Sequence, residues 1–226
     1  MPALLDAFTV PPGGQLPPET ASALFASFGK SPGLTSLSRA RLDAIARGFP
    51  VDIRKQVDPL FEKLQEGDTK QTERLDSISA KLVAGDLERG RTIFFNNQSA
   101  CSACHRVAGR GGSIGPDLSG IGGIRKRRDL LEAIAFPSAT IVNNYETWSA
   151  ITTSGKTHNG VIQGATARSI VLRNAQRMEI ELDRNDIDEL VRQPTSIMPQ
   201  GLDRTLTPDE LSDLLAFLES LRKQND

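Results

Sequence analysis

Both cysteines of this 226-residue chain lie in one four-residue window, and a histidine follows at once. The window reads Cys101-Ser-Ala-Cys104-His105, and the chain has only one other histidine, His158. Two cysteines with this spacing can serve as a redox dithiol, as half of a metal site or as a covalent anchor for haem. A disulfide between them would close almost no loop and would add little stability. The rest of the sequence has to distinguish the three chemistries.

The first two alternatives find little support in the surrounding sequence. A closed zinc site needs four ligands, usually from a second Cys-x-x-Cys or a histidine pair. Only His158 remains, so carboxylates would have to complete such a site. A thioredoxin-like dithiol follows a strand in a βαβ unit. Here the motif follows an amphipathic helix predicted from Asp86 to Asn96 and leads into a glycine-rich loop. Cys-x-x-Cys-His is the attachment signature of c-type haem, which the sequence therefore favours.

The periodicity of apolar residues divides the chain into regions of different predicted secondary structure. Residues 1–84 predict an N-terminal helical region of three or four short helices, and residues 85–226 predict a second domain. Within that domain, alternation and β-branched residues predict four or five strands, a β-rich insertion at about residues 145–190. Thr207, Pro208 and Glu210 predict the start of a C-terminal helix, because they form a capping box with proline at the first position.

Two further stretches suit a haem site. The sequence Gly115-Pro116-Asp117-Leu118 follows the motif, and a haem-ligating histidine usually donates its second N–H to an acceptor. The carbonyl of Pro116 fits that role, although such a string also forms simple turns. The candidates for a second iron ligand are Met1, Met178, Met198 and His158. Met198 is favoured, because it lies in an irregular loop braced by Pro194 and Pro199 just before the last helix.

The order of these motifs resembles a class I cytochrome c. More closely, GPDLSGIG, RRDLLEAIAFPSATIVNNYE, SIMPQGL and LTPDELSDLLAFLESL resemble the haem-binding domain of the Pirellula/Verrucomicrobium type. That domain is often the C-terminal module of large predicted membrane-bound dehydrogenases. The resemblance covers about residues 86–221 and implies one haem c attached through Cys101 and Cys104. It also implies His105 and Met198 as axial ligands, with Pro116 and Leu118 in the haem pocket.

These observations predict a mainly α fold: a cytochrome c-like helical haem domain, a small antiparallel β insertion and an N-terminal helical bundle. The expected function is single-electron relay rather than catalysis, because a six-coordinate iron leaves no open position. The alternative is a haem-based gas sensor, a small-ligand binder or a weak peroxidase. The expected partner is a dehydrogenase domain or another cytochrome. The basic run at residues 125–128 predicts either a solvated helix start or contacts to haem propionates.

Composition and charge bound the partners and the location. A net charge of −1 gives no general attraction to nucleic acid, and no apolar run reaches the length of a membrane span. Haem c is attached outside the cytoplasm, so a periplasmic or other extracytoplasmic location is expected. The sequence shows no secretory signal. We therefore expect an excised domain or a processed form.

Overall fold

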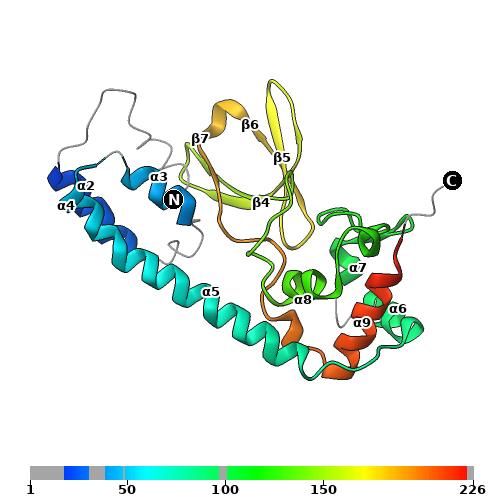
Figure 1. Cartoon of the computed structure of the whole chain (residues 1–226). Helices are drawn as coiled ribbons and strands as arrows, with labels where there is room; N and C mark the ends of the chain where they lie inside the picture. Colours follow the sequence, from blue (N-terminus) through cyan, green and yellow to red (C-terminus); the bar gives the residue numbers. More distant parts are fainter. Residues whose placement is uncertain (1–17, 31–38, 48, 97–100, 223–226) are drawn as a thin grey trace. The chain divides into compact units, whose positions relative to one another are not determined.

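The computed structural model describes residues 18–30, 39–47, 49–96 and 101–222 (Figure 1). Met1, one of the candidate iron ligands, lies outside these residues. The chain divides into two compact units, residues 1–74 and residues 75–226. The division falls inside helix α5 (Asp58–Ser79), ten residues before the boundary expected from the sequence. Residues 75–84 therefore belong to the same compact unit as the Cys-x-x-Cys-His motif.

The first unit is helical. Its elements before α5 are α2 (Pro18–Lys30), α3 (Arg39–Ala46), α4 (Val51–Arg54) and the short helix η2 (Lys55–Val57). Their apolar faces meet in one core, in which Phe25 and Phe49 pack edge to face with ring centroids 5.6 Å apart. Helix α5 continues through Gly67 without a break. A Cβ atom at Gly67 would meet nothing within 4 Å, so the glycine only lowers local helix propensity.

The second unit contains a helical half in which the last helix is central. Helices α6 (Leu87–Phe95), α8 (Arg127–Ala135) and α9 (Pro208–Ser220) pack around one apolar core. Three glycines lie against the backbone of α9, and a Cβ atom at any of them would come within 2.2 Å of a carbonyl oxygen. These residues are Gly85, Gly90 and Gly122. The close crossing of α6 and α9 therefore depends on glycine at the contact.

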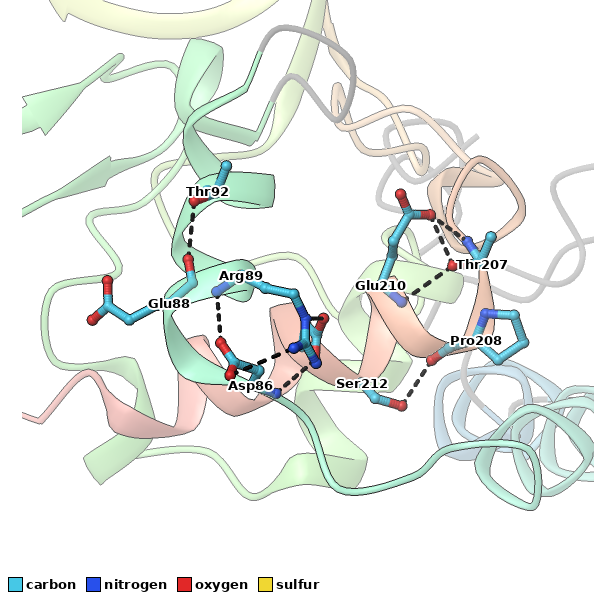
Figure 2. A network of polar contacts seen from close by, with 9 residues as sticks. Asp86, Glu88, Arg89, Thr92, Thr207, Pro208, Glu210 and Ser212 are labelled. Carbon is cyan, nitrogen blue, oxygen red and sulfur yellow. Dashed lines mark hydrogen bonds and ion pairs between the residues drawn. The ribbon is translucent and has the colours of Figure 1, made fainter.

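A buried carboxylate joins α6 to α9. Asp213 is only 4% exposed and accepts hydrogen bonds from the Asp86 amide at 2.6 Å and from Arg89 Nε at 2.7 Å. In Figure 2 the side chain of Arg89 extends from α6 toward α9. The hydrogen bond from Arg89 holds the pKa of the Asp213 carboxyl below its ordinary value. The predicted capping box of α9 is confirmed, since the Thr207 amide donates to Glu210 and the Glu210 amide donates to Thr207.

The other half of the second unit is an antiparallel sheet of five strands. In chain order these are β3 (Thr147–Thr152), β4 (Thr157–Ala165), β5 (Ser169–Arg173), β6 (Glu179–Asp183) and β7 (Ile187–Arg192). The spatial order is β6-β5-β4-β3-β7, so four consecutive strands form a meander and β7 returns beside β3. One face has its own apolar core around Ala150, Ile170 and Leu172. A two-stranded hairpin, β1 (Arg106–Val107) with β2 (Arg110–Gly111), follows the Cys-x-x-Cys-His motif.

The predicted fold class is wrong, because it gives too little weight to the strands. The protein is mixed α/β rather than mainly α, because the β-rich segment forms a complete sheet instead of a small addition to a helical domain. The physical reason is that every strand of the meander pairs with its neighbour and buries alternate side chains in a core separate from that of the helices. Within the described residues, no helix has the length and apolar character needed to cross a membrane.

Candidate haem site

The Cys-x-x-Cys-His motif folds as a single helical turn. Helix α7 spans Cys101–Cys104, and the His105 amide continues it by donating to the Cys101 carbonyl at 2.9 Å. Residues three apart lie on the same side of a helix, so the two thiols face in a similar direction. Neither cysteine forms a disulfide, both are partly buried, and Cys101 packs against the helical core. The backbone therefore places both thiols and the imidazole within one turn.

A glycine-rich loop lies against this turn. The Gly112 amide donates to the Ser102 carbonyl and the Gly115 amide donates to the Cys104 carbonyl, each at 2.9 Å. Gly111 has a φ of +114°, a conformation that side chains disfavour. A Cβ atom at Gly115 would lie 2.6 Å from Cε1 of His105. The loop can approach the imidazole only because it carries no side chain at that position.

The imidazole of His105 has a defined orientation. Its Nδ1 lies 2.9 Å from the carbonyl oxygen of Pro116. A carbonyl oxygen only accepts, so Nδ1 carries the proton and Nε2 is the nitrogen with a lone pair for a metal. Burial lowers the pKa of His105 below its ordinary value, while the hydrogen bond to Pro116 opposes that shift. The structure thus favours the neutral imidazole that metal ligation requires.

The two cysteines do not have the environment of a redox-active dithiol. Burial raises the pKa of the Cys104 thiol above its ordinary value, and the charge of Arg177 only partly offsets this. Thiols activated for exchange have a lowered pKa instead. The motif also lies between a helix and an antiparallel hairpin, not after a strand of a βαβ unit. Within the residues that the structure describes, no three His, Cys, Asp or Glu side chains gather as a site for a metal ion.

The remaining predicted site residues lie in two places. Leu118 is close to the motif, since its amide donates to the Arg106 carbonyl at 2.8 Å and its side chain packs on the helical core. Met198 is partly buried in the loop after β7, and its amide donates to Ser196 Oγ at 3.1 Å. Ser196 is held in turn by Ser138, just after α8. The hydrogen bond of the Met198 amide thus leads through Ser196 to Ser138 and not to His105.

The other sequence candidates lie on the sheet or in ion pairs. Met178 is 57% exposed in the turn between β5 and β6, and His158 lies on β4. The basic run divides between partners, because Arg127 pairs with Glu219 at 2.8 Å and Arg128 pairs with Asp76 at 2.7 Å. These two arginines therefore connect α8 to other helices.

Sequence reasoning missed a contact between the sheet and the glycine-rich loop. Arg173, at the end of β5, donates to Ser113 Oγ at 2.7 Å. Arg177, four residues later, is close enough to Cys104 to affect its pKa. Neither arginine stands in a motif, and they are 60 or more positions from Ser113 in sequence. Only strand register could have indicated that they reach this part of the molecule.

The residues of this site fit a covalently attached haem. Haem c needs two thiols one turn apart and an adjacent imidazole with a free Nε2, and helix α7 and His105 supply both. The glycine at position 115 leaves room beside the imidazole that a side chain would fill. Geometry and donor set together define the class of the protein as a c-type haem protein.

A comparison with protein families agrees with this class. The sequence model of the cytochrome c family matches residues 87–222, which is more than half of the chain. The chain therefore belongs to the cytochrome c family. A comparison with curated proteins gives no match. Membership of the family supports covalently bound haem c and a function in electron transfer, and domains of this family are typically extracytoplasmic.

Proposed function

We propose that residues 85–226 form a monohaem cytochrome domain in which His105 and Met198 are the axial ligands. Cys101 and Cys104 hold the haem through thioether bonds, and Pro116 and Leu118 belong to its pocket. The hydrogen bond between His105 Nδ1 and the Pro116 carbonyl carries this proposal, because it directs the metal-binding nitrogen away from the loop. Residues 1–84 are a separate helical region in this proposal, and residues 145–190 are a β-rich insertion.

Haem with histidine and methionine ligands supplies a one-electron couple of relatively high potential. The residues of the chain prepare the site for that couple. Pro116 holds the His105 imidazole in one orientation and in one tautomer, with Nε2 available to a bound iron. Ile114, which is 1% exposed, helps to keep water from the loop beside the imidazole. The two-residue chain of hydrogen bonds from Ser138 through Ser196 holds the backbone of Met198.

The proposed partner is a dehydrogenase domain of the same or a neighbouring chain, or another cytochrome, and the proposed location is the periplasm. Both follow from the resemblance to the haem-binding domain of the Pirellula/Verrucomicrobium type. The proposed role is that of an electron carrier, because ligation by both His105 and Met198 leaves no position at the iron for a substrate.

The test compares two methionines. The chain is produced with haem-maturation machinery, and its mass and absorption spectrum are recorded for the unchanged protein, Met198→Ala and Met178→Ala. We expect one covalent haem and a sulfur-to-iron charge-transfer band in the oxidised protein. Met198→Ala removes the band, whereas Met178→Ala keeps it, because Met178 is exposed on the hairpin turn.

Other outcomes point elsewhere. A mass without covalent haem contradicts haem attachment at Cys101 and Cys104. A high-spin spectrum that binds carbon monoxide rapidly in the unchanged protein favours a sensor, a small-ligand binder or a weak peroxidase. Loss of the band in Met178→Ala alone assigns the distal position to the hairpin instead of to Met198.

A further inference from the structure

The end of strand β5 presents an arginine on the face of the sheet opposite to the sheet core. Leu172 is fully buried in that core, so its neighbour Arg173 points to the other face. The cross-strand partners of Arg173 are Val161 on β4 and Glu179 on β6. Val161 is also fully buried, which means that this end of the second face is covered as well. Arg173 therefore lies at a contact and not on an open surface.

That contact is with the glycine-rich loop. Arg173 Nη1 donates to Ser113 Oγ at 2.7 Å, while its other terminal nitrogen forms an ion pair with Glu179. Its side chain is only 23% exposed, so the charged group is largely enclosed by these partners. The ion pair with Glu179 orients the guanidinium toward the loop. A charge-assisted hydrogen bond of this kind is stronger than one between neutral groups.

Ser113 stands at a sensitive position of the loop. The amides on either side of it, at Gly112 and Gly115, hydrogen bond to the α7 turn. Gly115 lies against the His105 ring, and the following residue, Pro116, accepts the hydrogen bond from His105 Nδ1. Arg173 thus holds the middle of the segment whose end orients the imidazole.

We propose that Arg173 is a positioning residue that clamps the loop at residues 111–116 onto α7 and thereby fixes the orientation of His105. The five-stranded sheet is, on this view, a working part of the haem site. The inference deepens the proposed function, since it concerns the residue proposed as the proximal ligand. Arg177, on the same hairpin, adds a positive charge near Cys104.

The first experiment measures the clamp without reference to haem. Amide hydrogen exchange is followed at Gly112 and Gly115 in the whole chain for Arg173→Gln, Ser113→Ala and the double variant. The matched control is Arg192→Gln, which removes another ion-paired arginine of the same sheet. We expect exchange about three- to tenfold faster in each single variant, since one hydrogen bond is lost. The double variant is no faster than either single one, and Arg192→Gln leaves both amides unchanged.

The second experiment measures the reduction potential of the haem-loaded chain. Ser113→Ala changes no charge, so it reports positioning alone. A looser His105 is a weaker donor to iron, which shifts the reduction equilibrium about threefold toward the reduced form. Arg177→Gln shifts it in the opposite direction, because it removes a positive charge and leaves the hydrogen bond between Arg173 and Ser113 in place.

The results that would overturn the proposal are separate from those that overturn the haem assignment. Unchanged exchange at Gly112 and Gly115, or equal acceleration in Arg192→Gln, rejects the clamp even when haem is bound. Faster exchange with an unmoved potential in Ser113→Ala rejects the role in positioning His105. Absence of covalent haem rejects the proposed function, while the exchange measurement still decides whether Arg173 holds the loop.

Discussion

The two halves of residues 75–226 are held together in different ways. In the helical half, α6 and α9 meet although Asp86 and Asp213 are 127 positions apart. In the sheet, β3, β4 and β5 each pair with the next strand along the chain, and β7 returns to pair with β3. Among the described residues, the helical core has thirteen buried members and the sheet core has four. The helical half therefore relies on a large core that joins distant segments.

This difference explains where the haem motif lies. A site that must hold a large group needs rigid surroundings. The core of the helical half joins residues that precede the sheet in the sequence to residues that follow it. The sheet is a local structure that reaches the loop after the motif through the hydrogen bond from Arg173 to Ser113. We therefore expect substitutions in the helical half to affect both folding and the site. Most substitutions in the sheet should affect stability alone.

The largest effect is expected for Gly90→Ala. Its new Cβ would lie 1.9 Å from the Asp213 carbonyl oxygen, so α6 and α9 have to separate. We expect a loss of about 3 kcal/mol in the free energy of unfolding, measured by urea denaturation. The control is Gly164→Ala on β4, where a Cβ atom meets nothing within 4 Å. Equal losses in the two variants would remove the proposed contrast between the halves.

A smaller loss in the free energy of unfolding is expected when a side chain in the core of the sheet is truncated. Leu172 is fully buried, and Leu172→Ala should lower the free energy of unfolding by about 2 kcal/mol, at the lower end for such changes. The absorption spectrum of the haem-loaded protein should stay the same, because Leu172 faces away from the loop. Leu190→Ala, on an edge strand and only partly buried, should cost less. A changed spectrum in Leu172→Ala would mean that the sheet supports the site through its core.

The buried carboxylate of α9 gives a prediction about pH. Asp213→Ala removes the acceptor of the Asp86 amide and of Arg89 Nε, and we expect a loss of about 2 kcal/mol in the free energy of unfolding at neutral pH. The pKa of Asp213 is lowered in the folded state, so its contribution is complete above the ordinary carboxyl pKa of about 4. That contribution disappears as the pH falls through the lowered folded-state pKa.

The measurement for Asp213 is urea denaturation at several pH values. The difference between the unchanged protein and Asp213→Ala should be greatest near pH 7 and should narrow as the pH falls below about 4. Asp188→Ala, which removes an exposed carboxylate from β7, serves as the control. The difference in unfolding free energy between this variant and the unchanged protein should vary little with pH. A difference that stays constant down to low pH would assign the effect to packing instead of charge.

The smallest effect is expected for Arg192→Gln. Arg192 is about half exposed and lies 3.5 Å from Glu146, a distance and an exposure that give a weak ion pair. The expected loss is below about 0.5 kcal/mol in urea denaturation. A measured loss well above that value would show that the edge of the sheet is more strongly coupled to its surroundings than the contacts indicate.

Local signals in the sequence were sufficient for several elements. Asp86 and Asn96 bound α6 as expected, and Thr207 with Glu210 begin α9. The acceptor role of Pro116 toward the histidine could be anticipated, because a motif and a proline eleven positions later lie in one short loop. The ligation of iron by Met198 stays a prediction. The sequence of its loop does not indicate what the thioether faces, and in the structure the loop is hydrogen bonded to Ser138.

The sequence by itself determined the chemistry of the site: two thiols and an imidazole in one turn, with a glycine-rich loop that can approach them. These are consequences of neighbouring residues, for which spacing is enough. Tertiary structure alone decided that the β-rich segment is a full sheet, that glycines line α9 and that Arg173 reaches Ser113. Those outcomes depend on strand register and helix crossing, which arise from the summed packing of residues far apart in the chain.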